Sequence, residues 1–417
     1  MQHAGTTPGL DPGTKAEVRV AQAWFWDGYY VRRGVDLQHK FGSEVSTVTD
    51  LDIVGFTFDA SLKVHKHVGE VKTGKSNNTP KPLDRALWAR GVRELVGAET
   101  AEITTAFKVS VSVRDLCRQL GATVQHLDDL TAREDRLAIK EVADVGAHGD
   151  TIASLRKAVH AFLKKDPVLE RGYWFLVSEV WFLEPFDAVK RTLGLIRELG
   201  KTWPEEAHPE AMRAARWIFA ESISIITLNL AMIAGRANTM DSATFRDLAS
   251  AELAQGDVPY FAVAKLSERF DEYLSKVLAR VEAPAEVRAT AMGAFHPTTP
   301  DYAVPLIELI SRLASEAASC AELPRQMDVI IFERLVRRRE LGETLMDRLS
   351  VTRSTERLVK LIAAFLRGQA ALPAAVDKVL TTKLTRWGSS LAPGETQPQL
   401  FDQPDADKAE GVAHGNN

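Results

Sequence analysis

A chain of 417 residues is long enough for two domains, and 45% hydrophobic with 26% charged residues is typical of a globular protein rather than a disordered or fibrous one. The formal net charge of −4 excludes a globally basic nucleic-acid binder, so contact with nucleic acid would depend on a local basic patch. The two cysteines, Cys117 and Cys320, are far apart and form no metal-ligand spacing. We therefore expect a reducing, cytoplasmic location without a disulfide framework.

The N-terminal part of the chain alternates between helix and strand. Residues 1–13, MQHAGTTPGLDPG, have neither a basic start nor an apolar core, so we expect a disordered end and no signal peptide. Residues 14–150 are predicted to form one domain. Its first helix is predicted over KAEVRVAQAWFWDGY, where Val18, Ala21 and Phe25 recur at helical spacing.

The predicted strands and helices that follow imply a mixed sheet flanked by helices, the first half of the expected fold class. The strand-like runs are GVDLQHKFG (34–42, the weakest), DLDIVGFTF (50–58), VHKHVGEVK (64–72), EITTAFKVSVS (102–112) and ATVQHL (122–127). The helical runs are LDRALWARGVRELVGA (83–98) and VRDLCRQLG (113–121).

Residues 151–392 are predicted to form an all-helical domain, because the helical pattern is interrupted there mainly by prolines. One stretch, Trp217 to Gly235, is long enough to span a bilayer. It contains Glu221 and Asn229, which would be costly in lipid. We therefore expect the central helix of a soluble bundle and no contact with a membrane.

Acidic residues stand in two strands that otherwise look buried. Alternate side chains of a strand share a face, so Asp50 and Asp52 lie on one side of their strand, and Glu70 and Lys72 share a side of the next. A hairpin would bring these pairs together among Val, Ile and Phe. Unpaired carboxylates there are costly, and Mg²⁺ favours one or two carboxylates with water and phosphate oxygens. A surface hairpin with ordinary salt bridges is the alternative.

Three segments in order, GTKAEVRVAQAWFWDGYYV, TDLDIVGF and GEVKTGK, resemble the PD-(D/E)XK nuclease superfamily, in particular its Mrr-like restriction and Holliday-junction resolvase-like branches. The family pattern is a helix with Glu, an aromatic-Gly-aromatic step, a hydrophobic-Asp-hydrophobic strand and (Glu or Gln)-x-Lys. The resemblance covers about a third of the chain. It implies Asp52, Glu70 and Lys72 as the catalytic core, with Asp52 and Glu70 binding Mg²⁺ or Mn²⁺. It also implies that Glu17 completes the site.

The sequence departs from the family pattern in ways that leave alternatives open. The usual proline before the first Asp is absent, and Asp50 competes with Asp52 as a metal ligand. We favour Asp52 because apolar residues flank it on both sides. Thr14 and Glu17 have the spacing of a helix capping box, which is an alternative role for Glu17.

A basic run follows the proposed site and predicts a phosphate-binding stripe. On its helix, we expect Leu83, Leu87 and Gly91 to line the opposite face. A solvated helix face is the alternative. The predicted DNA-binding residues are Lys75, Lys81, Arg85, Arg90 and Arg93.

Two further patterns carry less information. His65 and His67 form an H-x-H pair on the hairpin, but no third metal ligand is visible in the sequence. The basic segment RLVRRRELG, residues 334–342, would either touch nucleic acid or face water, and we favour water.

The tail, residues 393–417, is polar and rich in Gly, Pro, Asp and Gln, and we expect it to be disordered. Within it, QPQLF resembles the peptide by which bacterial DNA-processing proteins bind the sliding clamp. Gln397, Leu400 and Phe401 would make that contact, while a chance match is the alternative.

The sequence therefore predicts a Mg²⁺-dependent DNA endonuclease. A role in prokaryotic restriction, antiviral defence or DNA repair follows from the resemblance alone. The helical domain would bind DNA, a defence-system partner or another copy of the chain. The alternatives are a catalytically inactive nuclease-like module for DNA binding or assembly, and a nuclease that acts on RNA.

Overall fold

The computed structural model describes the chain from Leu10 to Leu384 with short gaps. The described residues are 10–41, 44–74, 79–142, 144–163, 165–205, 207–256, 259–292, 296–370 and 372–384. The predicted disordered tail and its clamp-binding residues Gln397, Leu400 and Phe401 lie outside them. The chain up to Thr382 forms one compact unit, which takes in the predicted domain 14–150 and residues 151–382 of the predicted helical domain; residues 383–417 are assigned to a second unit.

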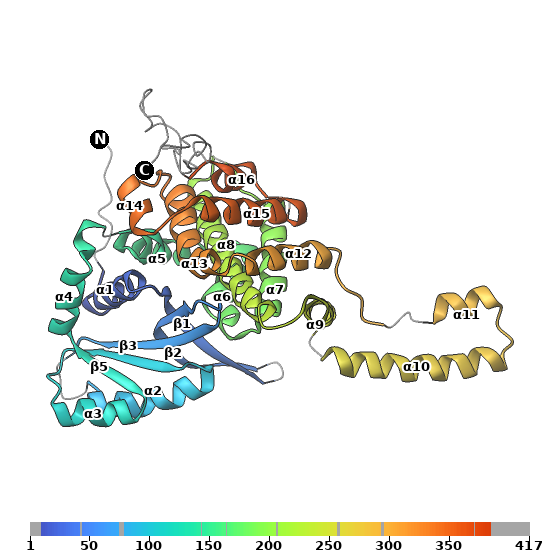
Figure 1. Ribbon diagram of the computed structural model, residues 1–417, viewed down its shortest axis with the longest axis horizontal. Coiled ribbons are helices and arrows are strands. Elements are labelled where there is room, and N and C mark those ends of the chain that lie inside the picture. Colours follow the sequence, from blue (N-terminus) through green and yellow to red (C-terminus); the bar gives the residue numbers. More distant parts are fainter. Residues whose placement is uncertain are drawn as a thin grey trace, which may run out of the picture. The chain divides into compact units, whose positions relative to one another are not determined.

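Five strands form a mixed sheet in the order β1-β2-β3-β4-β5 (Figure 1). β1, β2 and β3 pair antiparallel, whereas β4 pairs parallel with β3 and β5 pairs parallel with β4. This confirms the predicted fold class, a sheet flanked by helices and followed by a mostly helical region. The bounds of these elements are α1 (Pro12–Trp26), β1 (Tyr30–Phe41), β2 (Glu44–Phe58), β3 (Val64–Lys72), α2 (Pro82–Val96), β4 (Thr100–Thr105), α3 (Val111–Gln119), β5 (Ala122–His126) and α4 (Leu127–Arg136).

Two predicted boundaries in this part are wrong. The predicted strand 102–112 ends at Thr105, and α3 begins inside it at Val111. Ser110 caps α3, because its hydroxyl accepts a hydrogen bond from the Val113 amide at 3.4 Å. At the N-terminus, Pro12 and Gly13 belong to α1 rather than to a disordered end.

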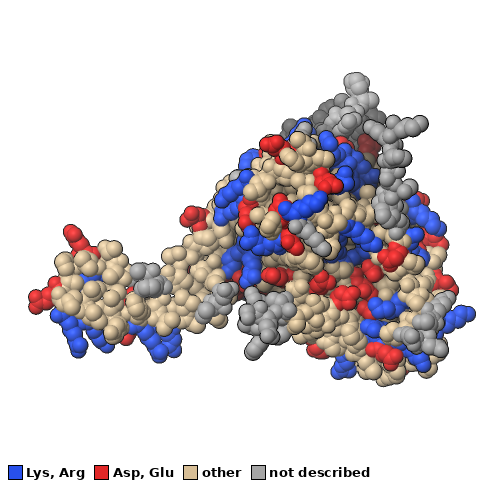
Figure 2. Space-filling model, turned by 180° about the vertical axis from the view of Figure 1, so that it is seen from behind, with Lys and Arg blue, Asp and Glu red and all other residues tan. Residues whose placement is uncertain are grey.

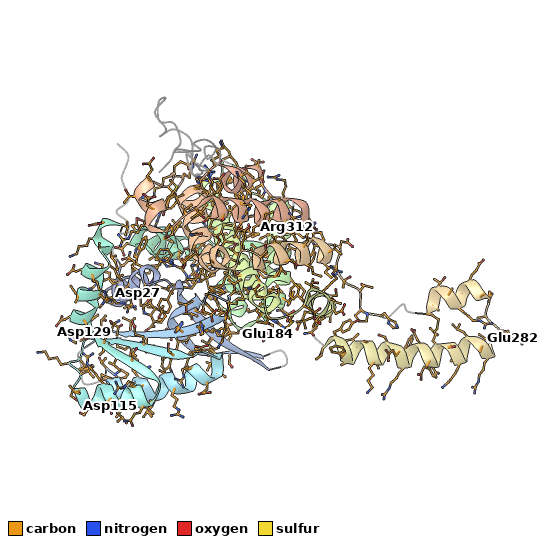
Figure 3. The ribbon with its side chains drawn as sticks, in the orientation of Figure 1. Asp27, Asp115, Asp129, Glu184, Glu282 and Arg312 are labelled. Atoms are coloured by element: carbon orange, nitrogen blue, oxygen red, sulfur yellow. The ribbon has the colours of Figure 1, made fainter. Side chains whose placement is uncertain are left out.

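Trp24 fixes α1 on the sheet. Its indole packs over Gly55 of β2 and Gly69 of β3, where a Cβ atom would lie 2.7 Å and 3.2 Å from ring carbons. The two strands thus need glycine at these positions for the close approach of the helix. The indole nitrogen donates to Glu102 Oε1 at 2.8 Å. Arg133 of α4 also binds Glu102, and it binds Asp27. Asp27, labelled in Figure 3, directly follows α1.

The helical region begins after two short 3₁₀ turns, η1 (Ile139–Glu141) and η2 (Gly146–His148). Its further elements are α5 (Asp150–Leu163), α6 (Pro167–Val177), η3 (Glu179–Phe182), α7 (Pro185–Lys201), α8 (Pro209–Ala237), α9 (Ser242–Ala254), α10 (Tyr260–Arg280), α11 (Ala285–Ala291), α12 (Ala303–Ala314), α13 (Ala317–Ile331), η4 (Phe332–Val336), α14 (Glu343–Arg348), α15 (Arg353–Gln369) and α16 (Ala374–Thr381).

α8 is the central helix of this region, as the sequence predicts, and α7, α12 and α13 pack around it (Figure 1). Among the described residues it is the one helix long and apolar enough to cross a membrane, and 94% of its most apolar window is buried inside the protein. Near its end, Gly235 lies against the backbone of the β2–β3 turn. A Cβ atom there would be 2.2 Å from the Leu62 carbonyl oxygen.

A buried ion cluster joins β1 to the helical region. Arg32 donates from Nε to Glu221 of α8 at 2.8 Å and from Nη2 to Asp328 of α13 at 2.5 Å. Ser224 of α8 accepts a further hydrogen bond from Arg32 at 2.8 Å. Burial alone would raise the pKa of Asp328, but the Arg32 guanidinium holds it below its ordinary value. The charges are therefore paired, as buried charges must be.

We expect Gly235→Ala to lower the free energy of unfolding by about 1–3 kcal/mol, because the new methyl group collides with backbone. Gly194→Ala in α7 is the matched control, since nothing lies within 4 Å of a Cβ atom there. Alanine should stabilise that exposed helix position by about 0.5–1 kcal/mol. Urea unfolding of both variants measures the effects, and equal changes would contradict the packing described for Gly235.

We expect Arg32→Met to lower the free energy of unfolding by about 3–5 kcal/mol, because two buried carboxylates lose their shared cation. Arg19→Met is the control: Arg19 forms an ion pair with Glu134 at 2.6 Å, but 38% of its side chain is exposed. Its loss should cost about 1 kcal/mol or less. A similar cost for both variants in urea unfolding would show that the Arg32 cluster does not join the two regions energetically.

Candidate active site

The hairpin of β2 and β3 brings three of the predicted catalytic residues together. Ile53 pairs with Gly69, so Asp52 lies beside Glu70 on the next strand. Both carboxyl side chains are buried, with Asp52 7% and Glu70 3% exposed. Lys72 Nζ lies 2.7 Å from Glu70 Oε1 and 3.2 Å from Asp52 Oδ2. Its side chain is 28% exposed, so the cluster reaches solvent on this side.

Backbone structure fixes the Asp52 carboxylate. The amide of Val71 donates to Asp52 Oδ2 at 2.7 Å, across the two strands. A carboxylate held by a backbone donor has little rotational freedom, so its second oxygen keeps a defined position. No hydrogen bond joins Asp52 Oδ1 or Glu70 Oε2 to another described residue.

Asp50, the competing ligand, lies away from this cluster. It is exposed and pairs in register with Asp36 of β1. Together with partial burial, the Asp50 charge raises the pKa of Asp36. Of the two aspartates, Asp52 is therefore the one that shares a site with Glu70 and Lys72.

Glu17 of α1 reaches the same site, and Arg33 of β1 holds it. Arg33 Nη1 donates to Glu17 Oε2 at 3.4 Å. Burial and the nearby Asp52 charge raise the pKa of Glu17. The predicted capping-box alternative is wrong, because Asp11 is the N-cap of α1 and accepts the Thr14 amide at 2.9 Å. Glu17 is free of any capping role.

Sequence reasoning missed Arg33. Burial and the neighbouring Arg156 lower the pKa of Arg33 to about 10. Arg156 of α5 also donates to the backbone carbonyl of Gly34 at 2.7 Å, which ties the helical region to this part of β1. The signal in the sequence was the pair of adjacent arginines within an otherwise apolar strand, YYVRRGV.

The predicted basic stripe of α2 divides into residues with different surroundings. Arg85 joins the site, because its Nη1 donates to Glu70 Oε1 at 3.2 Å and its Nε is buried without a partner among the described residues. Arg93 donates to the Gly121 carbonyl at 3.1 Å, between α3 and β5. Lys81 and Arg90 are exposed, and Lys75 lies outside the described residues.

The predicted apolar face of α2 is wrong. Leu87 is 57% exposed, and the space around Gly91 is open. The residues that pack against the protein are instead Ala86, Ala89, Val92 and Val96. Because alanine is small, the helix can lie close to the sheet. Packing against the sheet, rather than the hydrophobicity of each side chain, therefore decides which residues of α2 are buried. Figure 2 shows acidic and basic side chains interspersed on one face of the molecule, as the near-neutral total charge suggests.

The two histidines of β3 have ordinary polar partners. His65 Nδ1 lies 2.8 Å from Glu99 Oε2, and His67 Nδ1 lies 2.7 Å from Thr100 Oγ1. Within the described part of the chain, three or more His, Cys, Asp and Glu side chains nowhere gather as a ready-made metal cluster. Among the described residues, no third metal ligand therefore lies beside His65 and His67.

The electrostatics of the candidate site fit a divalent cation. Burial and the adjacent Asp52 charge raise the pKa of Glu70 to about 7, so two carboxylates this close need added positive charge. Burial acts to lower the pKa of Lys72, but Asp52 and Glu70 outweigh it and raise that pKa. Mg²⁺ needs one or two carboxylates, and Asp52 Oδ1 with Glu70 Oε2 offers that set.

Comparison with known proteins adds no relative: no family model, curated protein or solved structure matches the chain. The resemblance to the nuclease superfamily thus rests on the sequence motifs alone and stays a prediction.

We expect Glu70 to make the metal-free protein less stable as the pH rises from 4.5 to 7. The raised pKa means that the folded state favours the neutral acid, so its contribution is complete below pH 4.5 and is lost through about pH 7. Relative to Glu70→Gln, the wild-type free energy of unfolding should fall by up to about 3 kcal/mol over this window.

Urea unfolding in a chelating buffer, at several pH values, measures this difference. Glu99→Gln is the control, because His65 lowers the pKa of the Glu99 carboxylate and no such loss follows. If the free energies of unfolding of wild type and Glu70→Gln had the same pH dependence from pH 4.5 to 8, the pKa of Glu70 would not be raised in the folded protein.

Proposed function

We propose that this protein is a Mg²⁺-dependent DNA endonuclease that hydrolyses phosphodiester bonds. The observation that supports it best is the buried Asp52–Glu70–Lys72 cluster, in which each carboxylate keeps one oxygen free of other described residues. Neither oxygen is among the buried side-chain atoms that lack a partner, so each is open to solvent or to a bound cation. Asp52 and Glu70 would hold the metal. Bound there, Mg²⁺ lowers the pKa of a water molecule and neutralises charge on the phosphodiester.

The chain's own residues supply the remaining chemistry. Lys72 stays protonated, since its pKa is raised, and its ammonium can stabilise negative charge that builds on the phosphate oxygens. Glu17, held by Arg33, would accept a hydrogen bond from the attacking water and orient it. Arg85 donates from Nη1 to Glu70 at 3.2 Å, and 25% of its side chain is exposed, so its guanidinium could also bind a phosphate.

The proposal includes a choice of substrate and setting. The chemistry of the cluster serves DNA and RNA alike, and DNA is proposed on the resemblance to the nuclease superfamily. A role in prokaryotic restriction, antiviral defence or DNA repair is proposed on the same ground. A cytoplasmic location is proposed from the two distant cysteines, and binding of the sliding clamp from the resemblance of QPQLF to clamp-binding peptides. A catalytically inactive nuclease-like module that binds DNA is the second candidate.

We expect Lys72→Ala and Glu70→Gln each to reduce the cleavage rate by at least about 10²-fold, because Lys72 would stabilise charge on the phosphate and Glu70 would hold the metal. Lys63→Ala is the matched control, an exposed lysine on the same hairpin. The assay follows linear, nicked, branched and single-stranded DNA, and RNA, with Mg²⁺, with Mn²⁺ and with a chelator.

Each outcome of this assay has a defined meaning. Native cleavage by Lys72→Ala would show that the site is wrongly assigned. Cleavage of RNA alone would change the substrate. DNA binding without cleavage by the wild type, in either metal, would favour the inactive module.

A further inference from the structure

α10 carries an apolar face that is exposed to solvent. Half of the sixteen large apolar residues that are exposed in the described chain lie between residues 260 and 292, on α10, α11 and the turns beside them. The main contacts of α10 with other described elements are to α9 and α11, its neighbours along the chain (Figure 1). α10 therefore lacks the cover that the surrounding helices give to α8.

Five of these exposed residues form one line along the helix, which we call the α10 seam. It consists of Leu266, Phe270, Tyr273, Val277 and Val281, whose exposed fractions run from 36% to 68%. They recur at intervals of three and four positions, the spacing of the apolar residues that join two helices in a coiled coil. The adjoining face of α10 is used within the chain, because Ser267 is buried and Asp271 Oδ2 lies 2.9 Å from His296 Nε2.

The area of the α10 seam matches what a stable protein interface needs. At these exposed fractions its side chains present on the order of 500 Å² of largely apolar surface, taking about 150–250 Å² for a complete side chain. Because interfaces are about 56–65% apolar, such a seam corresponds to roughly 800 Å² of interface per copy. That is about the area that each partner buries in a standard-size complex. An apolar patch of this size marks an interaction site.

The α10 seam is complementary to itself. In a two-fold symmetric pair, the commonest protein oligomer, the same patch of both copies meets. If the two-fold axis passes through the centre of the seam, the helices run antiparallel. Phe270 then lies opposite the second copy's Tyr273, and Leu266 lies opposite the second copy's Val277. Aromatic side chains thus meet aromatic ones and aliphatic side chains meet aliphatic ones.

The charged residues of α10 suit a second copy better than a phosphate-rich surface. Four cations and three carboxylates are interspersed along the helix, so a lipid headgroup layer or a nucleic acid would meet both signs of charge. An identical helix presents the same mixture, without a field of one sign that would keep two copies apart. The residues concerned are Lys265, Arg269, Lys276 and Arg280, with Glu268, Asp271 and Glu272.

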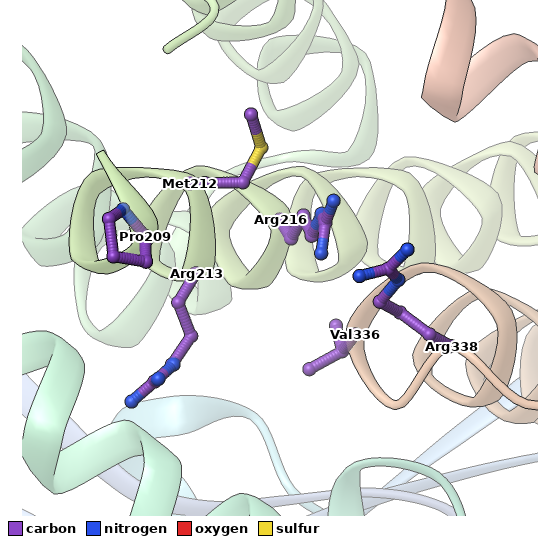
Figure 4. A pocket seen from close by; sticks show the side chains of 6 residues that line it. All are labelled: Pro209, Met212, Arg213, Arg216, Val336 and Arg338. Atoms are coloured by element: carbon purple, nitrogen blue, oxygen red, sulfur yellow. The ribbon is translucent and has the colours of Figure 1, made fainter. Parts of the chain in front are cut away.

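The basic surfaces of the helical region are not suited to such a pairing. The pocket between the start of α8 and η4 contains three arginines, and like charges would oppose contact with the same pocket of another copy. It is lined by Pro209, Met212, Arg213, Arg216, Val336 and Arg338 (Figure 4). In the basic segment 334–342, the expectation of a water-facing surface is wrong for Arg337, which is 6% exposed and donates to Asp144 Oδ1 at 3.0 Å. Arg337 is therefore bound within the protein.

We propose that two copies of the chain form a dimer by packing their α10 seams against each other in antiparallel orientation. The dimer removes the seam from water, and it gives the 21 residues of α10 the packing on which helices in proteins mainly depend. No residue of the candidate active site belongs to α10, so the dimer does not rest on the proposed nuclease activity.

Sedimentation of the full chain over a range of concentrations measures the dimer. The key variant combines Leu266→Glu with Tyr273→Glu, which puts two carboxylates into the α10 seam. Phe261→Glu is the matched control. Phe261 is the most exposed large apolar residue of α10, at 79%, but it lies about 140° around the helix from Leu266. Glutamate is a good helix former, so both variants keep α10 intact.

We expect wild type and Phe261→Glu to dimerise equally, and the seam variant to have a dimer dissociation constant at least tenfold higher. A wild type that stays monomeric up to about 100 μM, or a seam variant that dimerises as the wild type does, would overturn the proposal. Loss of the dimer on deletion of residues 393–417 would also overturn it, because the tail would then provide the contact. Glu70→Gln should dimerise as the wild type does, whatever its effect on cleavage.

A mixture of two single variants tests the antiparallel orientation. Leu266→Glu and Val277→Lys should each weaken the dimer when alone. Mixed, they should restore it, because antiparallel packing places the new carboxylate opposite the new ammonium group. Parallel packing would leave these charges apart, so a mixture no more dimeric than either variant alone would contradict the proposed arrangement.

Discussion

The charge of Arg32 in the middle of the protein is the constraint on which the rest of the structure depends. A guanidinium that is 6% exposed requires partners, and its carboxylates come from α8 and α13, far along the chain. The sheet is therefore held to the helical region by paired charge as well as by apolar packing. Because side chains alternate along a strand, the next residue, Arg33, points the other way and holds Glu17. One strand thus anchors the helices with one arginine and orders the candidate site with the next.

The aspartates of the two buried charge clusters differ in how completely their oxygens are used. In the Arg32 cluster, Asp328 Oδ1 accepts from Arg32 and Ser224, and Oδ2 accepts from the Ala147 amide at 3.2 Å. In the candidate active site, Asp52 and Glu70 each retain an oxygen without such a partner in the described chain. Both oxygens of Asp328 are thus used within the protein, whereas Asp52 Oδ1 is available to a ligand; Glu221, in the Arg32 cluster, is bonded through Oε2. Trp24 makes the second arrangement rigid by packing on Gly55 and Gly69.

Sequence reasoning succeeded where the physical cause is local. The period of two in the strands was enough to place Asp52, Glu70 and Lys72 on a shared face, because a hairpin needs few residues to form. It failed where the environment of a residue depends on contacts with elements that are far away in the sequence. The buried face of α2 follows from the sheet beneath its alanines, and the water-facing expectation for Arg337 failed because Asp144, 193 residues away, binds it. Glu17 and Arg33 are only 16 apart, but their contact depends on how α1 lies on the sheet.

The residues of the Arg32 cluster are far apart in the sequence, and this affects how the protein folds during its synthesis. Arg32 and Asp328 are separated by 296 positions, so at about 5–20 residues per second roughly 15–60 s pass between their synthesis. During this time Arg32 is already part of the nascent sheet, but its partner Asp328 has not yet been synthesised. The N-terminal third therefore completes its folding late, after most of the chain has left the ribosome. A chain that stops before α13 lacks Asp328, one of the two carboxylates that bind Arg32.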